Sequence, residues 1–270
     1  MITVFEGKSV NDVWSQAFDA LERKALEGFT NGSRDGQVVG EICEAVFCVK
    51  DPTRNIVTNK IRNMPMRYAI GELAWYLAGS NRVSDIARFA KKWVDISDDG
   101  MHNNSAYGWR IFDKFDFNQW EYVKALMMQD PNTRQAIIHI KDASCTPTKD
   151  TPCTVYLQFL LRDGKLNLSV HMRSNDIWMG VPYDMFSFTF LQMKMAMELG
   201  VEIGEYTHYA GSLHMYARDY EAARKNAEEY KLICGQNNPP SHGIPTADPS
   251  VTGHPHWGPE GTGRDRFTQG

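Results

Sequence analysis

The chain has 270 residues, of which 42% are hydrophobic and 23% are charged, a balance typical of a globular protein and not of a disordered one. The formal net charge of −4 disfavours broad nucleic-acid binding, although it is compatible with a local basic pocket for one phosphate. No segment approaches the roughly 18 apolar residues of a membrane-spanning helix, and the first residues do not resemble a signal peptide. We therefore expect a cytoplasmic location.

The first half of the chain predicts helices around one strand. Apolar residues recur at helical spacing from Val10 to Leu21, and residues 37–50 are rich in β-branched and apolar side chains, as in a strand. A second helix is predicted over residues 66–78, between a proline and a glycine. A third is predicted over residues 116–129, before an Asp-Pro pair.

The second half of the chain predicts a sheet. An Asp-Gly pair at residues 163–164 is a strong hairpin signal between two expected strands. The expected strands are residues 134–141, 153–162, 165–174 and 205–216, and the expected helices are residues 185–199 and 217–229. This mixed order indicates an α+β fold with one main sheet.

The composition changes near the C-terminus. Six of the 12 prolines and seven of the 21 glycines lie in the last 40 residues. We expect one folded domain over residues 1–233 and a Pro/Gly-rich irregular tail over residues 234–270.

The cysteines are scattered and odd in number, which favours neither a disulfide framework nor a zinc site and suits a reducing compartment. They are Cys43, Cys48, Cys145, Cys153 and Cys234. Cys153 follows a proline at the start of an expected strand, a rigid position from which a thiolate can attack. A buried structural cysteine is the alternative.

A polar run closes the expected strand over residues 165–174. Strand alternation predicts Arg173 and Asn175 on one face, with Ser174 and Asp176 on the other. The run is either a solvated strand end or a phosphate clamp in which the guanidinium forks onto the anion.

Four more polar positions each have two possible interpretations. Asp184 either caps the helix that follows it or has a functional role. His214 and Tyr216 share one strand face, as a core pair or as a ligand site. Glu72 lies in an apolar helix, where a carboxylate needs a partner, water or a function.

In order, these segments resemble the thymidylate synthase superfamily, closest to phage deoxycytidylate 5-hydroxymethyltransferases. Intervals of 20, 31 and 61 residues separate Cys153 from Arg173, Asp184 and His214. The motifs that carry the resemblance are Gly71-Glu-Leu-Ala-Trp75, Ser105-Ala-Tyr-Gly-Trp109, Asp130-Pro-Asn-Thr-Arg134, Pro152-Cys153, Arg173-Ser-Asn-Asp176, Val181-Pro-Tyr-Asp184 and Gly211-Ser-Leu-His-Met-Tyr216.

The resemblance implies a homodimer with the two sheets packed back to back, and a folate-dependent reaction. In the family's reaction, Cys153 would add to C6 of a pyrimidine nucleotide, and C5 would then attack the methylene of 5,10-methylenetetrahydrofolate. Neither a metal nor direct nucleic-acid binding is implied.

The resemblance also assigns roles to individual residues. The catalytic set is Cys153, Glu72, Asp184 and Tyr107. The substrate-binding set is Arg34, Arg173, Ser174 and Asn175, with His214 and Tyr216 at the sugar hydroxyl and Arg134 reaching the partner's phosphate site. The cofactor-binding set is Trp93, Asp176 and Gly180.

Three departures from the synthases sharpen the expectation. Asp184 replaces the asparagine that reads uracil, and a carboxylate suits the N4 amine and N3 of cytosine. Thr154 replaces the usual histidine after the nucleophile, as in the phage hydroxymethylases, and the polar end of the chain is a poor seal against water. Gln135 replaces a second arginine, so one phosphate contact is missing or comes from elsewhere.

We therefore expect a dCMP 5-hydroxymethyltransferase that releases tetrahydrofolate. The alternatives are a dCMP methyltransferase that releases dihydrofolate, a dUMP thymidylate synthase, a non-catalytic nucleotide-binding relative and a structural dimer module. The intact set of Glu72, Tyr107 and Cys153 argues against the last two, because binding alone needs no thiolate.

Overall fold

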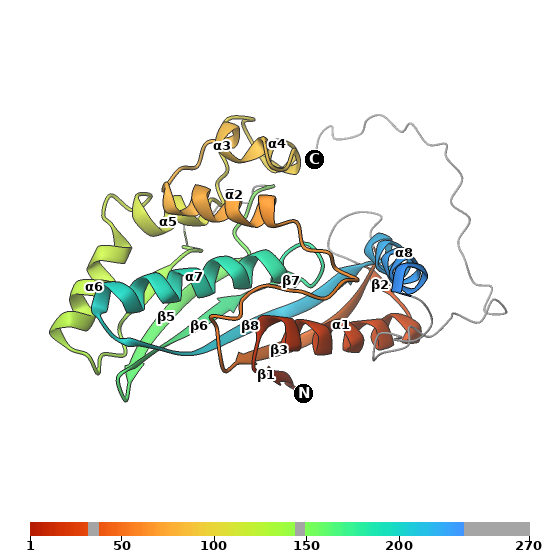
Figure 1. The fold of residues 1–270 in the computed structure, drawn as a ribbon. Coiled ribbons are helices and arrows are strands. Elements are labelled where there is room, and N and C mark those ends of the chain that lie inside the picture. The colour runs from red at the N-terminus through yellow and green to blue at the C-terminus, as the bar shows by residue number, and fades with distance from the viewer. Residues whose placement is uncertain (32–37, 144–148, 235–270) are drawn as a thin grey trace.

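The computed structural model describes residues 1–31, 38–143 and 149–234 (Figure 1). Within them, one mixed sheet of eight strands forms the centre, in the order β1-β3-β8-β6-β5-β4, with β2 paired to β3 and β7 to β8. The strands are β1 (Thr3–Gly7), β2 (Thr30–Asn31), β3 (Val38–Val49), β4 (Ile137–His139), β5 (Thr154–Arg162), β6 (Lys165–Met172), β7 (Asn175–Asp176) and β8 (Glu202–Tyr216). The predicted α+β fold with one main sheet is confirmed.

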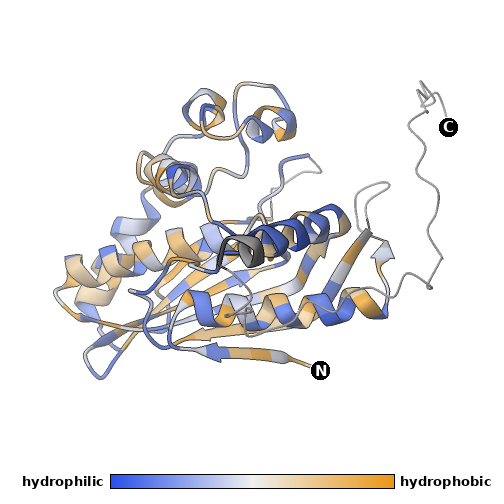
Figure 2. Cartoon of the chain, turned by 45° about the vertical axis from the view of Figure 1, so that its right-hand side comes forward, coloured by the Kyte–Doolittle hydropathy of each residue, from blue (hydrophilic) through white to orange (hydrophobic). Residues whose placement is uncertain are grey.

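The helices lie mainly over one face of this sheet. Helices α1 and α7 run along the sheet, α2 packs on α7, and α3 and α4 lie beyond α2 (Figure 1). The helices are α1 (Val10–Glu27), α2 (Met66–Leu77), α3 (Val83–Ala87), α4 (Lys92–Ile96), α5 (Tyr107–Phe112), α6 (Gln119–Gln129), α7 (Val181–Leu199) and α8 (Ala217–Cys234). Hydrophobic residues follow the strands and α7 in Figure 2, where the two layers form the core. No described helix has the length and apolarity needed to cross a membrane.

Long, periodic elements match the sequence predictions except at their ends, whereas the short elements β1, β2, β7, α3, α4 and α5 are not predicted. The predicted hairpin is present, with Asp163 and Gly164 both at positive φ, as its tight turn requires. Helix α6 begins three residues later than expected because Asn118 accepts the backbone N–H of Glu121 and caps it. Helix α7 begins four residues earlier than expected, with Pro182 in its first turn.

The start of α7 decides between the two readings of Asp184. Gly180 holds the N-cap position, so Asp184 lies inside the first turn and the cap reading is wrong. Most of the tail, residues 235–270, lies outside the described residues, and the division into a domain and a tail stays a prediction.

The contact between α5 and α2 depends on a glycine. A Cβ at Gly108 would lie 2.0 Å from the carbonyl oxygen of Tyr76, closer than any side-chain carbon tolerates. Gly108→Ala is therefore expected to lower the free energy of unfolding by about 3 kcal/mol or more, measured by urea denaturation. The control is Ala74→Gly on the exposed side of α2, which changes helix propensity at a cost of about 1 kcal/mol. Equal costs for the two variants would contradict the tight contact.

Candidate active site

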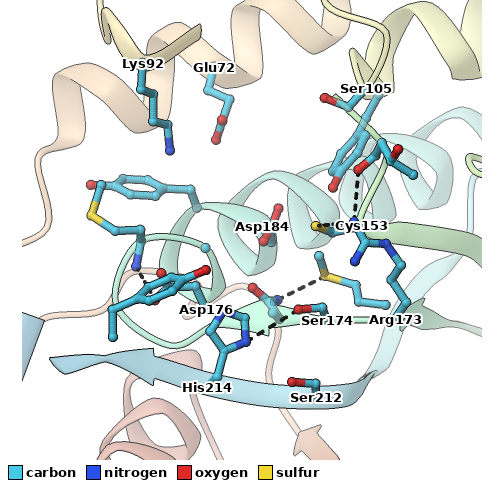
Figure 3. Close-up of a pocket in the computed structure, with 18 of the residues that line it drawn as sticks. Glu72, Lys92, Ser105, Cys153, Arg173, Ser174, Asp176, Asp184, Ser212 and His214 are labelled. Carbon is cyan, nitrogen blue, oxygen red and sulfur yellow. Dashed lines mark hydrogen bonds between the residues drawn. The ribbon is translucent and has the colours of Figure 1, made fainter. Parts of the chain in front are cut away.

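A cavity of about 710 Å³ lies between the sheet, α2, α4, α5 and the start of α7 (Figure 3). It brings together most of the predicted site residues from segments far apart in the chain. Those that line it are Glu72, Trp93, Tyr107, Cys153, Arg173, Ser174, Asn175, Asp176, Gly180, Asp184, His214 and Tyr216.

Two predicted residues lie elsewhere. Arg34 falls in residues 32–37, outside the described residues. Arg134 is exposed before β4 and does not line this cavity, and its reach to a partner's phosphate stays a prediction.

Cys153 lies directly before β5, at the edge where β5 and β6 pair. The backbone N–H of Arg173 donates to the carbonyl of Cys153 (2.9 Å), which fixes the two residues side by side. The Arg173 guanidinium contacts the residues that precede β5, with Nη2 3.6 Å from the Cys153 sulfur and Nε 3.1 Å from the carbonyl oxygen of Pro152. A cation beside a partly exposed thiol favours the thiolate, which is the attacking form.

Tyr107 lines the cavity close to Cys153. Its hydroxyl accepts the backbone N–H of Thr154 (3.3 Å). Burial, with the nearby Cys153 and Asp184, raises the pKa of Tyr107 well above its usual value. Tyr107 therefore keeps its proton and can donate it in a hydrogen bond within the cavity.

Glu72 is buried in α2 and belongs to a hydrogen-bonded chain. Tyr68 Oη donates to Glu72 Oε1 (2.6 Å), and Trp93 Nε1 donates to Tyr68 Oη (3.1 Å). Burial raises the pKa of Glu72, while the Tyr68 hydrogen bond and the charge of Lys92 act in the opposite direction. Glu72 thus combines both predicted readings, an internal network and a place in the cavity.

Asp184 faces the same cavity from the first turn of α7 (Figure 3). Burial raises its pKa well above the usual value, and the charge of Glu72 adds to the shift. Lys92 and a hydrogen bond from Asn175 oppose it without reversing it. The environment of Asp184 therefore favours its protonated form over the carboxylate.

Gly180 makes room for this acid. A Cβ on Gly180 would lie 2.3 Å from Asn175 Oδ1 and 3.2 Å from Asp184 Oδ2. Any larger residue would displace the two polar side chains, so the glycine serves the geometry of the site.

The predicted split of residues 173–176 between two faces is wrong, because all four line the cavity. The chain bends at Arg173, between β6 and β7, which interrupts strand alternation. Asn175 Nδ2 lies 3.0 Å from His208 Nε2, inside the core. Asp176 Oδ1 accepts the backbone N–H groups of Trp178 and Met179, which shapes the turn before α7.

His214 and Tyr216 lie on one face of β8, as predicted, with ring centroids 5.2 Å apart. Ser174 Oγ lies 3.5 Å from His214 Nδ1, which joins the predicted phosphate and sugar residues. The guanidinium of Arg218 covers the Tyr216 ring at 4.6 Å.

The sequence interpretation missed several residues in or next to the cavity. Tyr68 does not line the cavity but donates to Glu72, and it was detectable, since a tyrosine four residues before Glu72 on a helix faces the same side. Lys92, Lys149 and Arg218 line the cavity, but no local pattern indicates where their side chains point. Among the described residues, no cluster of histidine, cysteine and acidic side chains is arranged to hold a metal.

The thymidylate synthase family model matches residues 17–232. The chain is also 35% identical over 234 residues to the deoxyuridylate hydroxymethyltransferase of Bacillus phage SP01. That match covers 81% of this chain and 60% of the relative, so this chain spans well under the relative's full length. The family match includes the segments that carry Cys153, Arg173 and Asp184. The protein is a member of the thymidylate synthase family.

Proposed function

We propose that this protein transfers a one-carbon unit from 5,10-methylenetetrahydrofolate to C5 of dCMP, and that water completes the product as 5-hydroxymethyl-dCMP. The observation that carries the proposal is Asp184, a buried carboxylic acid that shares the cavity with the Cys153 thiol. Family membership supports the one-carbon chemistry, and Asp184 supports the choice of base.

The choice of base follows from where the electrons go when sulfur adds. As the Cys153 sulfur bonds to C6, the electrons of the C5–C6 double bond move toward C4. In cytosine they continue to N3, and Asp184 can deliver its proton there as the S–C6 bond forms. In uracil they continue to O4, where an amide N–H is the suitable donor. A protonated carboxyl at residue 184 therefore favours dCMP.

The cavity suits the folate. Trp93 offers an indole face for stacking, and Asp176 and Gly180 offer a carboxylate and a backbone group to the pterin. When bound, 5,10-methylenetetrahydrofolate supplies the carbon that becomes attached to C5. We assign the nucleotide phosphate to Arg173 and Ser174, with Arg34 and the partner's Arg134, and the sugar hydroxyl to His214 and Tyr216.

The last steps use Glu72 and Asp184. Loss of the C5 proton and departure of tetrahydrofolate, which takes up a proton at N5, would leave an exocyclic methylene on C5. A water molecule adds to this methylene and gives its proton to the Glu72 carboxylate. The electrons pass through the ring to N3 and then return, which re-forms the C5–C6 double bond and expels the Cys153 thiolate. The N3 proton goes back to Asp184, and the ring regains its aromatic form.

A second candidate is the same reaction on dUMP, because the phage relative is named a deoxyuridylate hydroxymethyltransferase. A methyl product is the other alternative, since a hydride in place of water would give 5-methyl-dCMP and dihydrofolate.

Turnover of labelled nucleotides separates these candidates. With 5,10-methylenetetrahydrofolate, we expect tritium release from [5-³H]dCMP to be at least about 100-fold faster than from [5-³H]dUMP. We expect mass spectrometry to detect 5-hydroxymethyl-dCMP, and no dihydrofolate absorbance to appear. Faster release from dUMP would overturn the cytosine assignment, and dihydrofolate formed in step with turnover would identify a methyltransferase.

A further inference from the structure

Lys92 extends from the first position of α4 into the cavity, on the side of Glu72 (Figure 3). Its ammonium nitrogen lies 5.7 Å from the centroid of the Tyr68 ring and 5.6 Å from that of Trp93. Cation–π attraction to two rings holds the charge at the mouth of the cavity, beside the chain that ends on Glu72. Nucleotide binding, folate binding and attack by the thiol do not require a lysine at this position.

Tyr68 fixes the donor and acceptor roles in the hydrogen bonds that link Trp93 to Glu72. The Trp93 indole N–H can only donate, so the Tyr68 oxygen accepts from it and must direct its own O–H to Glu72 Oε1. This places a donor on one carboxylate oxygen, and a hydrogen bond of that kind favours the ionised form of Glu72.

The other groups that act on Glu72 or Asp184 are tyrosines and acids, apart from the amide of Asn175. On α2, α5, β7, α7 and β8, they are Tyr68, Tyr76, Tyr107, Asp176, Tyr183 and Tyr206. Burial raises the pKa of each of these tyrosines, so they are neutral. Among the described residues, Lys92 is the cation whose charge favours the ionised form of both Glu72 and Asp184.

We propose that Lys92, together with the Tyr68 hydroxyl, keeps Glu72 ionised, so that the one proton of the carboxyl pair resides on Asp184. Lys92 is a positioning residue, because it acts through Glu72 and not on the nucleotide. The assignment of tasks rests on the proposed function: Glu72 accepts the proton of the attacking water, and Asp184 protonates N3. Without the lysine both carboxyls would be neutral, and the pair would have an acid but no base.

The pH dependence of dCMP turnover tests this proposal. Removal of a nearby positive charge makes the carboxylate less stable, so the pKa of Glu72 rises and the acidic limb of kcat/KM moves to higher pH. We expect Lys92→Met to move this limb up by about one pH unit or more, with about a tenfold loss at pH 6 and a smaller loss at pH 8. Lys92→Arg, which keeps the charge, should restore the wild-type profile.

Lys91→Met is the matched control, because Lys91 is exposed, adjoins Lys92 and does not line the cavity. We expect it to leave the profile unchanged. Superimposable profiles for Lys92→Met and the wild type would overturn the proposal, as would an equal loss at all pH values with Lys92→Arg failing to rescue.

A measurement without turnover separates this proposal from the proposed function. In protein labelled with ¹³C at the glutamate carboxyls, and with Glu72 assigned through Glu72→Gln, NMR titration reports the ionisation of Glu72 directly. Lys92→Met is expected to raise the midpoint even if dCMP is not the substrate. An unchanged midpoint would overturn the role of Lys92, whereas failure of dCMP turnover with a shifted midpoint would overturn only the substrate assignment.

Discussion

Replacement of Cys153 by serine is expected to reduce kcat for dCMP by on the order of 10⁴-fold or more, because a hydroxyl is a far weaker nucleophile than a thiolate at neutral pH. The Arg173 guanidinium, 3.6 Å from the sulfur, favours a thiolate but cannot ionise a serine to a useful extent. Tritium release from [5-³H]dCMP measures the effect.

Cys43→Ala is the control, since Cys43 is exposed on β3 and does not line the cavity. It should retain wild-type turnover. A second readout is the covalent adduct of the protein with 5-fluoro-dCMP and 5,10-methylenetetrahydrofolate. The reaction stops at this adduct because C5 of 5-fluoro-dCMP carries fluorine and has no proton to lose. Mass spectrometry should find the adduct in wild-type protein and not in Cys153→Ser. A non-catalytic nucleotide-binding protein would instead bind dCMP equally well in both forms and give no adduct in either.

Asp184→Asn is expected to invert the choice of base. The amide has no acidic proton for N3 of cytosine, but it can donate to O4 and accept from N3–H of uracil. We expect kcat/KM for dCMP to fall by about 10³-fold and turnover of dUMP to rise until it exceeds that of dCMP. Competition between the two nucleotides, followed by mass spectrometry of the products, measures the ratio.

Glu41→Gln is the control for this exchange, because Glu41 lines the same cavity but accepts a hydrogen bond from Ser212. It should leave the preference for dCMP in place. If Asp184→Asn still prefers dCMP, residue 184 does not select the base, and the cytosine assignment loses its support.

Asp184→Asn is expected to raise the thermal stability of the protein, although it lowers the turnover of dCMP. Asp184 has a raised pKa in the folded protein, so the folded state binds this proton more tightly than the unfolded chain does. Its favourable contribution is complete at low pH and is lost as pH rises above the usual carboxyl pKa. Asp184→Asn should therefore raise the thermal midpoint relative to wild type more at pH 8 than at pH 5.

Local patterns in the sequence predict the long elements well. The periodicity from Val10 to Leu21 and the Asp-Gly turn at residues 163–164 depend only on neighbouring residues, and both predictions are confirmed. The sequence does not predict β1, because a five-residue strand becomes recognisable only through its parallel pairing with β3, some 42 residues further on.

The site is predictable as a set of residues but not as an arrangement. The family resemblance identifies twelve residues that meet in one cavity, ten of them within the ordered motifs. They do not reveal that α7 begins at Val181, with Pro182 in its first turn and Asp184 facing the cavity, or that a bend at Arg173 interrupts strand alternation. The sequence around Lys92 does not predict that its side chain lies on the same side of the cavity as Glu72, because this position depends on how the short helix α4 packs against α2.

The backbone of Arg173 links three strands. Its N–H bonds the carbonyl of Cys153 before β5, and its C=O accepts the N–H of Ser212 in β8. These two strand links are made by main-chain atoms that every amino acid except proline possesses, whereas the guanidinium donates to the carbonyls of Thr151 and Pro152 and lies beside the Cys153 sulfur. A replacement at residue 173 would therefore keep the links between strands but release the turn that carries Cys153, so a single side chain couples anion binding to the placement of the thiol.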